Sequence, residues 1–146
     1  TQLPAIDEEL VCVTENDACC VDAIQCLLGC TYGKANLIPR LRGKMAFTFF
    51  VRDENSSAAK AVRLFLKPEA GEGMSRDEYQ NYLLNTPYTE LFEVLEPRIA
   101  LPEPARHFAS EHCSVCGEYT AEYGLRLQDG KPVCLDCYSA YEREGF

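Results

Sequence analysis

Histidine is scarce in this chain of 146 residues, and its only two copies, His107 and His112, lie beside a cysteine cluster near the C-terminus. No Ser/His/Asp catalytic grouping can therefore be argued from the sequence. The chain also has no run of about 18 apolar residues, which a membrane span requires, and its first residues lack the basic and apolar regions of a secretory signal. These absences predict a soluble, cytoplasmic protein with no membrane partner.

Cysteine, in contrast, is abundant, with nine copies in a chain that shows no secretory signal. Such usage predicts metal or redox chemistry rather than a disulfide framework. Four of the cysteines form two C-x2-C pairs that are separated by seventeen residues: Cys113, Cys116, Cys134 and Cys137. Four thiolates at this spacing predict a structural zinc site, and a site with four protein ligands has no open position for catalysis. We keep His107 and His112 as minor alternative ligands.

The net charge of −9 is distributed unevenly. Eight lysines and arginines lie between Thr31 and Lys67, where only Asp53 and Glu54 oppose them. This basic cluster could bind a small anion, or it could simply be a solvated, charge-balanced face. Residues 113–146 carry three basic residues against six carboxylates, which argues against nucleic acid as a partner.

The hydrophobic pattern predicts strands, one hairpin and several helices, followed by a small finger. Polar caps and glycines set the expected helix ends, and β-branched or aromatic runs set the strands. We expect a strand over 9–15; a mostly buried helix from about Ala18 to Leu28, capped by Asn16 or Asp17 and ended by Gly29; a hairpin of strands 45–52 and 60–67 around the turn 53–57; a helix from the Ser75/Glu78 capping box to about Leu84; and a helix from Thr86 or Pro87 to Glu96.

Three prolines make residues 96–106 a poor helix, so we expect a linker there. The predicted domains are a core over 1–96, a linker over 97–110 and a zinc finger over 111–146. Within the finger, Asp129-Gly130 predicts a hairpin turn between strands 123–128 and 131–133. A helix over 136–144 would complete a fold that is treble-clef-like or zinc-ribbon-like.

The early cysteines are harder to interpret. Free cysteine packs as a small apolar residue, and we expect this of Cys12, Cys20 and Cys26. Cys30 follows the helix-ending Gly29, so we expect its thiol to be within reach of a ligand, with Thr31, Lys34 and Asn36 beside it. The segment from Gly29 to Lys34 is not a phosphate loop, because its glycines are one residue too close and Ala35 follows the lysine.

Three segments carry a resemblance that no single motif provides. They read Glu15-Asn-Asp-Ala-Cys-Cys-Val-Asp-Ala-Ile-Gln25, Gly29-Cys-Thr-Tyr-Gly-Lys-Ala-Asn-Leu37 and Gly43-Lys-Met-Ala-Phe-Thr-Phe49. In this order they resemble the FmdE family of formylmethanofuran dehydrogenase proteins, over about Leu10 to Lys67. The resemblance implies an α+β fold in which the core is an antiparallel sheet with packed helices, often dimeric, and is followed by a C-terminal zinc finger.

The resemblance also implies a second metal site, in which the cysteine of the Gly-Cys-Thr segment meets an upstream His-x-His-x-Cys-Pro-Gly segment. Cys30 matches that cysteine. The residues that match the surrounding motif, and so would face the ligand or support the site, are Asp17, Cys19, Asp22, Gln25, Lys34 and Asn36. The His-x-His-x-Cys-Pro-Gly segment does not occur in this sequence. We expect that a natural N-terminal segment precedes these residues, the alternative being a member that has lost half of the site.

Three functions remain open at this point. The first is a metal-binding accessory protein of a molybdenum or tungsten formylmethanofuran dehydrogenase in one-carbon, methanogenesis-related metabolism, likewise implied by the resemblance. The second is a zinc- or thiolate-dependent enzyme built on Cys30, for which Lys34 would favour the ionised sulfur. The third is an adaptor whose finger docks a protein partner.

Overall fold

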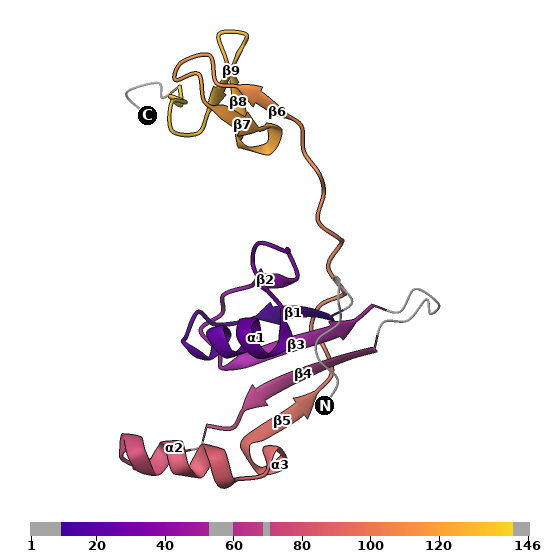
Figure 1. The fold of residues 1–146 in the computed structure, drawn as a ribbon, viewed down its shortest axis with the longest axis vertical. Helices are drawn as coiled ribbons and strands as arrows, with labels where there is room; N and C mark the ends of the chain where they lie inside the picture. Colours follow the sequence, from indigo (N-terminus) through magenta and orange to yellow (C-terminus); the bar gives the residue numbers. More distant parts are fainter. Residues whose placement is uncertain (1–9, 53–59, 69–70, 142–146) are drawn as a thin grey trace. The chain divides into compact units, whose positions relative to one another are not determined.

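Five strands form one mixed sheet in the order β2-β1-β3-β4-β5 (Figure 1). The computed structural model describes residues 10–52, 60–68 and 71–141, and the chain divides into two units, 1–104 and 105–146. The sheet belongs to the first unit. Its strands are β1 Leu10–Thr14, β2 Leu37–Pro39, β3 Ala46–Val51, β4 Lys60–Leu66 and β5 Phe92–Leu95.

The pairing of these strands confirms the predicted first strand and hairpin and corrects one expectation. β1 is antiparallel to β3, β3 to β4, and β4 to β5, whereas the predicted turn 53–57 lies outside the described residues. β2 runs parallel to β1, with Cys12 opposite Leu37. The expectation of a fully antiparallel sheet is therefore wrong, because a crossover helix connects β1 to β2 and such a connection returns the chain in the same direction.

That crossover is α1, Cys20–Leu28, which ends at Gly29 with a left-handed φ of 65° as predicted. Its start differs from the expectation, because Cys19 occupies the N-cap position and no side chain caps the helix. The Asn16 side chain instead accepts a hydrogen bond from the Ala18 amide at 3.1 Å. Asn16 thus closes a turn that precedes the helix, which delays the helix by two residues.

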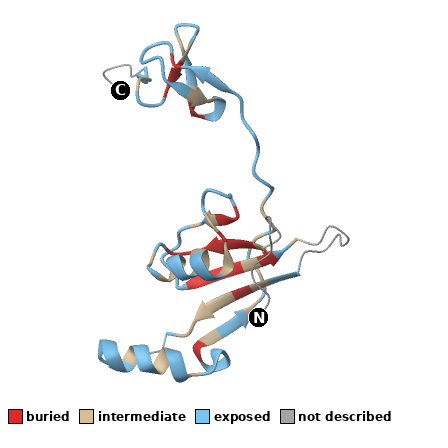
Figure 2. Ribbon diagram, viewed as in Figure 1, coloured by how far each residue is buried: buried red, intermediate tan, exposed pale blue. Residues whose placement is uncertain are grey.

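The expectation that this helix is mostly buried is also wrong. No residue of α1 is fully buried, and Leu27 is 72% exposed (Figure 2). One side of the helix, including Val21, Ile24 and Leu28, packs against a cluster that contains Cys12 and Phe47. A helix on the outside of a single sheet has only one partner, so its other side faces outward whatever its composition.

The helix α2, Arg76–Asn85, confirms the predicted capping box. The Glu78 amide donates to Ser75 Oγ, and the Ser75 amide donates to the Glu78 carboxylate at 2.8 Å. The next prediction fails in its second half, since α3 covers only Tyr88–Leu91 and the chain then continues as β5. Residues 92–95 pair with β4, placing Phe92 opposite Leu66, and this pairing satisfies backbone groups that a longer helix would have bonded internally.

The other face of the sheet is covered by the segment after β5. Residues 96–109 contain no helix or strand, as expected. Ile99 and Leu101 pack against Val11, Val13 and Phe50, and Arg52 Nη2 donates to the Pro102 carbonyl at 2.9 Å. The first part of the segment that we expected to be a linker therefore contributes to the core of the first unit.

The second unit contains two small hairpins. Its elements are β6 Ser110–His112, β7 Tyr119–Ala121, the 3-10 turn Glu122–Gly124, β8 Leu125–Gln128 and β9 Lys131–Cys134. β6 pairs with β7 and β8 with β9, each antiparallel. Asp129 and Gly130 both have positive φ, 50° and 75°, which confirms the predicted hairpin turn.

The helix that we expected over 136–144 is absent from its described part, which ends at Tyr141. The Ser139 amide donates to the Gln128 side chain at 2.8 Å, whereas a helix would direct that amide to the backbone carbonyl four residues earlier. The finger is therefore zinc-ribbon-like rather than treble-clef-like. Within the described ranges, no helix has the length and apolar character needed to cross a membrane.

Candidate functional site

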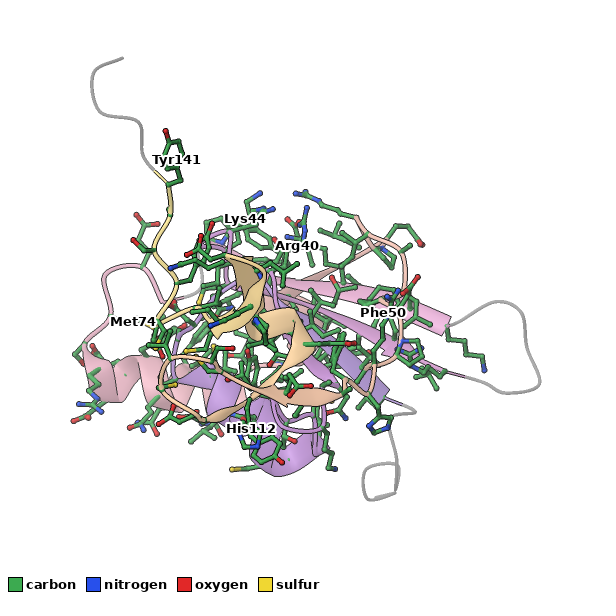
Figure 3. The ribbon with its side chains drawn as sticks, turned by 90° about the horizontal axis from the view of Figure 1, so that it is seen from above. Arg40, Lys44, Phe50, Met74, His112 and Tyr141 are labelled. Atoms are coloured by element: carbon green, nitrogen blue, oxygen red, sulfur yellow. The ribbon has the colours of Figure 1, made fainter. Side chains whose placement is uncertain are left out.

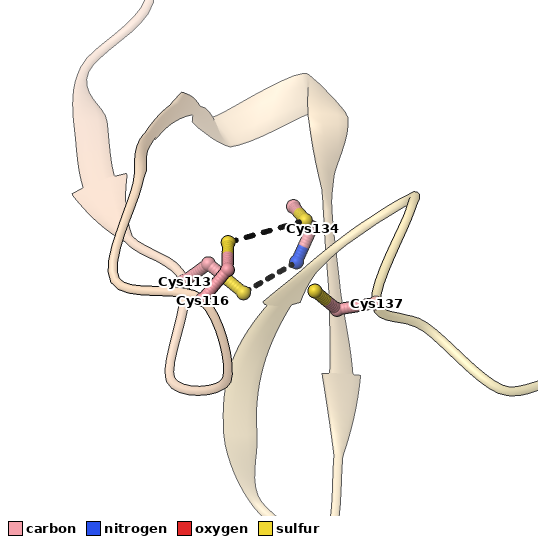
Figure 4. Close-up of side chains that lie close together, drawn as sticks. All are labelled: Cys113, Cys116, Cys134 and Cys137. Atoms are coloured by element: carbon pink, nitrogen blue, oxygen red, sulfur yellow. Dashed lines mark hydrogen bonds between the residues drawn. The ribbon is translucent and has the colours of Figure 1, made fainter.

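Four cysteine sulfurs come together in the second unit (Figure 4). The Sγ atoms of Cys113, Cys116, Cys134 and Cys137 all lie within 4.8 Å of one another, and the Cys116 and Cys134 sulfurs are 3.9 Å apart. Four ligands at zinc–sulfur bonds of about 2.3 Å form a tetrahedron with edges of about 3.8 Å. The spacing of the thiols thus fits a tetrahedral metal ion.

Two tight turns position these sulfurs. Cys113 follows β6, and the Gly117 amide donates back to the Cys113 carbonyl at 2.9 Å, with Gly117 at a φ of 77°. Cys134 ends β9, and the Cys137 amide donates back to the Cys134 carbonyl at 3.1 Å. Each C-x2-C pair therefore bends around one turn, which directs both of its sulfurs to the same point.

Backbone amides also prepare the cluster for negative charge. The amides of Cys134 and Val115 donate to Cys113 Sγ at 3.3 and 3.4 Å. Backbone amides lower the pKa of Cys113 to about 6, and the largest contribution comes from Cys134, followed by Cys116. The neighbouring Cys134 side chain is the main cause that raises the pKa of Cys137 to about 12. Four thiolates so close together need a cation between them, and this donor set fits one.

The two histidines do not join this cluster. His112 Nδ1 lies 2.8 Å from the Gly117 carbonyl, and its ring lies 3.9 Å from the ring of Tyr119. His107 is exposed on the segment before β6. The group of close ligand atoms among the described residues consists of the four cysteines alone.

Cys30, the second predicted site residue, lies in the core of the first unit. It is 0% exposed, in a cluster with Cys12, Leu37 and Phe47. Its thiol donates to the Leu10 carbonyl at 3.5 Å. Burial raises its pKa, against an opposing contribution from Lys34. The expectation of a reachable thiol is wrong, because Cys30 packs into the apolar cluster that α1 covers.

Three of the predicted polar residues do gather around Cys30. The Asn36 side chain donates to the carbonyls of Leu10 and Gly29 at 3.1 and 3.5 Å, and it accepts from the Thr31 amide at 2.8 Å. Lys34 Nζ donates to the Gly29 carbonyl at 3.2 Å. Asn36 is itself buried, so its hydrogen bonds hold the loop between α1 and β2 against the core.

The remaining candidates lie just before α1 or within it. Asp17, Cys19 and Asp22 are exposed around the start of α1 and Gln25 is partly buried, whereas Cys30 follows the end of the helix. Of the cysteines expected to pack as small apolar residues, Cys12 is buried and Cys20 is partly buried, but Cys26 is exposed.

The first unit contains a buried ion pair that the sequence did not predict. Arg63, which we counted in the basic cluster, is buried on β4 and bonds to Glu15, just after β1. No local signal distinguishes it from the other basic residues. Arg40 and Lys44 lie on the loop that leads into β3 (Figure 3), with Lys44 exposed and Arg40 partly so. The basic cluster is therefore not a single solvated face.

Comparison with known proteins agrees with this arrangement. Residues 1–96 match the family model described as "FmdE, Molybdenum formylmethanofuran dehydrogenase operon". The chain belongs to the FmdE family. Residues 108–143 match the model of the prokaryotic dksA/traR C4-type zinc finger, so the four-cysteine cluster of this FmdE protein lies within a recognised metal-binding module.

Two individual relatives extend the comparison. A tungsten formylmethanofuran dehydrogenase FmdE-like protein from Syntrophus aciditrophicus shares the fold, with a TM-score of 0.57, 22% identity and coverage of 88% of this chain and 70% of that one. A probable S-adenosyl-L-methionine-binding protein from Archaeoglobus fulgidus is 27% identical over 163 residues, covering 95% of this chain. This FmdE chain spans 43% of that relative's length.

Proposed function

We propose that this FmdE protein is a zinc-binding accessory protein of the formylmethanofuran dehydrogenase type, in which the finger holds one structural zinc ion. The four sulfurs within 4.8 Å of one another carry this proposal. Four thiolate ligands are typical of structural zinc and complete its coordination, so the ion would stabilise the finger and take no part in catalysis. Cys113, Cys116, Cys134 and Cys137 would hold the ion.

Metal analysis of the purified chain tests this assignment. We expect about one zinc per chain in the wild type and none in a Cys134→Ser variant, because three thiolates bind a structural zinc far more weakly than four. Cys26→Ser is the matched control, since Cys26 is an exposed thiol of the first unit. Unchanged zinc content in Cys134→Ser, or iron in place of zinc, would contradict the proposal.

The accessory role rests on the family. We propose a cytoplasmic homodimer that associates with a molybdenum- or tungsten-dependent formylmethanofuran dehydrogenase and thereby serves one-carbon metabolism. The description of the matching family, which names the operon of that enzyme, supports the association. Gel filtration of the purified chain with the purified dehydrogenase tests it: co-elution is expected, and separate elution at micromolar concentrations would refute a stable complex.

A ligand site centred on Cys30 is a second proposal. The polar groups of Thr31, Lys34 and Asn36 around the thiol favour it, and Lys34 draws the Cys30 pKa downward. Because Cys30 is buried and already bonds to the Leu10 carbonyl, an ion there would need further ligands from outside this loop. A second zinc per chain, lost in Cys30→Ala while the finger zinc remains, would support this site and an enzymatic function. A single zinc that Cys30→Ala leaves unchanged would refute the site.

A further inference from the structure

A cavity of about 260 Å³ lies in the first unit, and neither Cys30 nor a cysteine of the finger is among the residues that line it. It opens between the start of α1 and the helix α2, above β3, β4 and β5. α1 packs its apolar side over Cys12 and Phe47, whereas α2 contributes Tyr79 and Leu83 to the opposite wall. Two helices on one sheet face leave the space between them open.

The floor of the cavity is a row of side chains across three strands. The Leu66 amide donates to the Met45 carbonyl at 2.9 Å, and Leu66 lies opposite Phe92 in the β4–β5 ladder. Phe47, two residues after Met45, points to the same face because side chains alternate along a strand. Sulfur and aromatic rings thus form most of the floor.

The walls are held in place by their neighbours. The Cys20 thiol donates to Asn16 Oδ1 at 3.4 Å, while the exposed Cys19 lies at the rim. On the α2 side, a Cβ added at Gly71 would overlap the Tyr79 ring. The absence of a side chain at Gly71 therefore allows that ring to line the cavity.

We propose that this cavity binds a small, uncharged aromatic molecule of one or two rings. None of the eight lining residues carries a formal charge, and burial raises the pKa of Cys20, which keeps that thiol neutral. A cavity of about 150 Å³ with an aliphatic and phenyl lining admits benzene, so the larger space here accepts a bicyclic ring. Met and Cys sulfurs make favourable contacts with aromatic edges, which selects rings over aliphatic chains.

Indole is a suitable probe, because the chain contains no tryptophan and its own fluorescence does not mask that of indole. We expect saturable binding to the full, zinc-loaded chain, accompanied by a blue shift of indole emission. Leu83→Lys places a charge in the wall and should weaken binding by about tenfold or more. Leu84→Lys, the adjacent α2 residue at 81% exposure, is the matched control and should bind indole as the wild type does.

A second pair of variants covers the case in which Leu83→Lys does not fold. Cys19→Asp places a carboxylate at the exposed rim and should also weaken binding, whereas Cys26→Asp, on an exposed position of α1, should not. Absence of saturable indole binding by the wild type would overturn the proposal, as would equal binding by all four variants. If the wild type excludes indole and Leu83→Lys converts a dimer to a monomer in sedimentation, a second copy of the chain covers the cavity, and the ligand proposal is wrong.

Discussion

Arg63 and Glu15 form a two-point ion pair inside the sheet unit. Arg63 Nε donates to Glu15 Oε1 at 2.6 Å, and Nη2 donates to Oε2 at 2.9 Å. The side chains are 1% and 5% exposed. The backbone of Glu15 is bonded as well: its amide donates to the Ala46 carbonyl, and its carbonyl accepts from the backbone amide of Arg42. The pair therefore ties β4 to the segment between β1 and α1.

Loss of one partner of this ion pair should lower the stability of the first unit. In Arg63→Met the Glu15 carboxylate stays buried without its cation, and we expect the free energy of unfolding to fall by about 3–5 kcal/mol. The double variant Glu15→Gln/Arg63→Met should lose less, because no unpaired charge remains. Urea unfolding measures both, with Arg42→Met as an exposed control. If Arg63→Met is no less stable than Arg42→Met, the pair does not contribute as described.

The same pair should make the sheet unit sensitive to acid. The hydrogen bonds from Arg63, together with its charge, hold the pKa of the Glu15 carboxyl below its usual 4.5. A lowered pKa in the folded state means that the stabilisation is complete above the unfolded value and is lost as the pH falls through the folded value. Urea unfolding at a series of pH values should therefore show wild type and Glu15→Gln converging below pH 4.5. A difference that stays constant through that range would contradict this linkage.

Local signals carried the successful sequence predictions. The capping box at Ser75, the left-handed Gly29, the Asp129-Gly130 turn and the two C-x2-C pairs each depend on residues a few positions apart. Their geometry forms wherever the rest of the chain lies, so the sequence alone predicts them.

Contacts between residues far apart in the sequence explain why other sequence predictions were wrong. Residues 92–95 are a strand because β4 offers them a pairing edge, although their composition permits a helix. Cys30 is buried because β1 and Leu37 cover it, and Arg63 is buried because Glu15 receives it. In each case the deciding partner lies more than six residues away, where neither hydrophobic period nor capping pattern carries information.

Asn36 should matter for stability independently of any ligand. Its buried side-chain amide donates to the Leu10 and Gly29 carbonyls and accepts from the Thr31 amide. In Asn36→Ala the Thr31 amide loses this acceptor, whereas each of the two carbonyls loses one donor and keeps another. We expect a loss of about 1–3 kcal/mol in the free energy of unfolding. Asn85→Ala, which removes a single exposed hydrogen bond to Asn81 on α2, is the control and should lose much less. Equal losses in the two variants would show that the buried hydrogen bonds of Asn36 do not stabilise the fold as described.

Metal removal should unfold the four-cysteine finger and leave the sheet of the first unit folded. Chelation deprives the four thiolates of their cation, and small metal modules owe most of their folding energy to that ion. We expect amide hydrogen exchange in β8 and β9 to become fast after chelator treatment, while β1, β3 and β4 keep their protection. Readdition of zinc should restore it. Protection of β8 and β9 that survives complete metal loss would show that the finger folds without an ion.

Two glycines of one turn separate backbone strain from side-chain contact. Gly71 and Gly73 both have positive φ, 86° and 75°. An added Cβ at Gly73 meets nothing within 4 Å, whereas one at Gly71 overlaps the Tyr79 ring. Gly73→Ala should therefore cost only the strain of a left-handed residue, about 1–2 kcal/mol. Gly71→Ala carries the same strain and must also displace the ring that forms one wall of the apolar cavity.

Indole titration separates the two effects: Gly71→Ala should lose affinity for indole and Gly73→Ala should keep it, because only Gly71→Ala alters the cavity. If both variants bind indole equally, Tyr79 is not a wall on which the ligand depends.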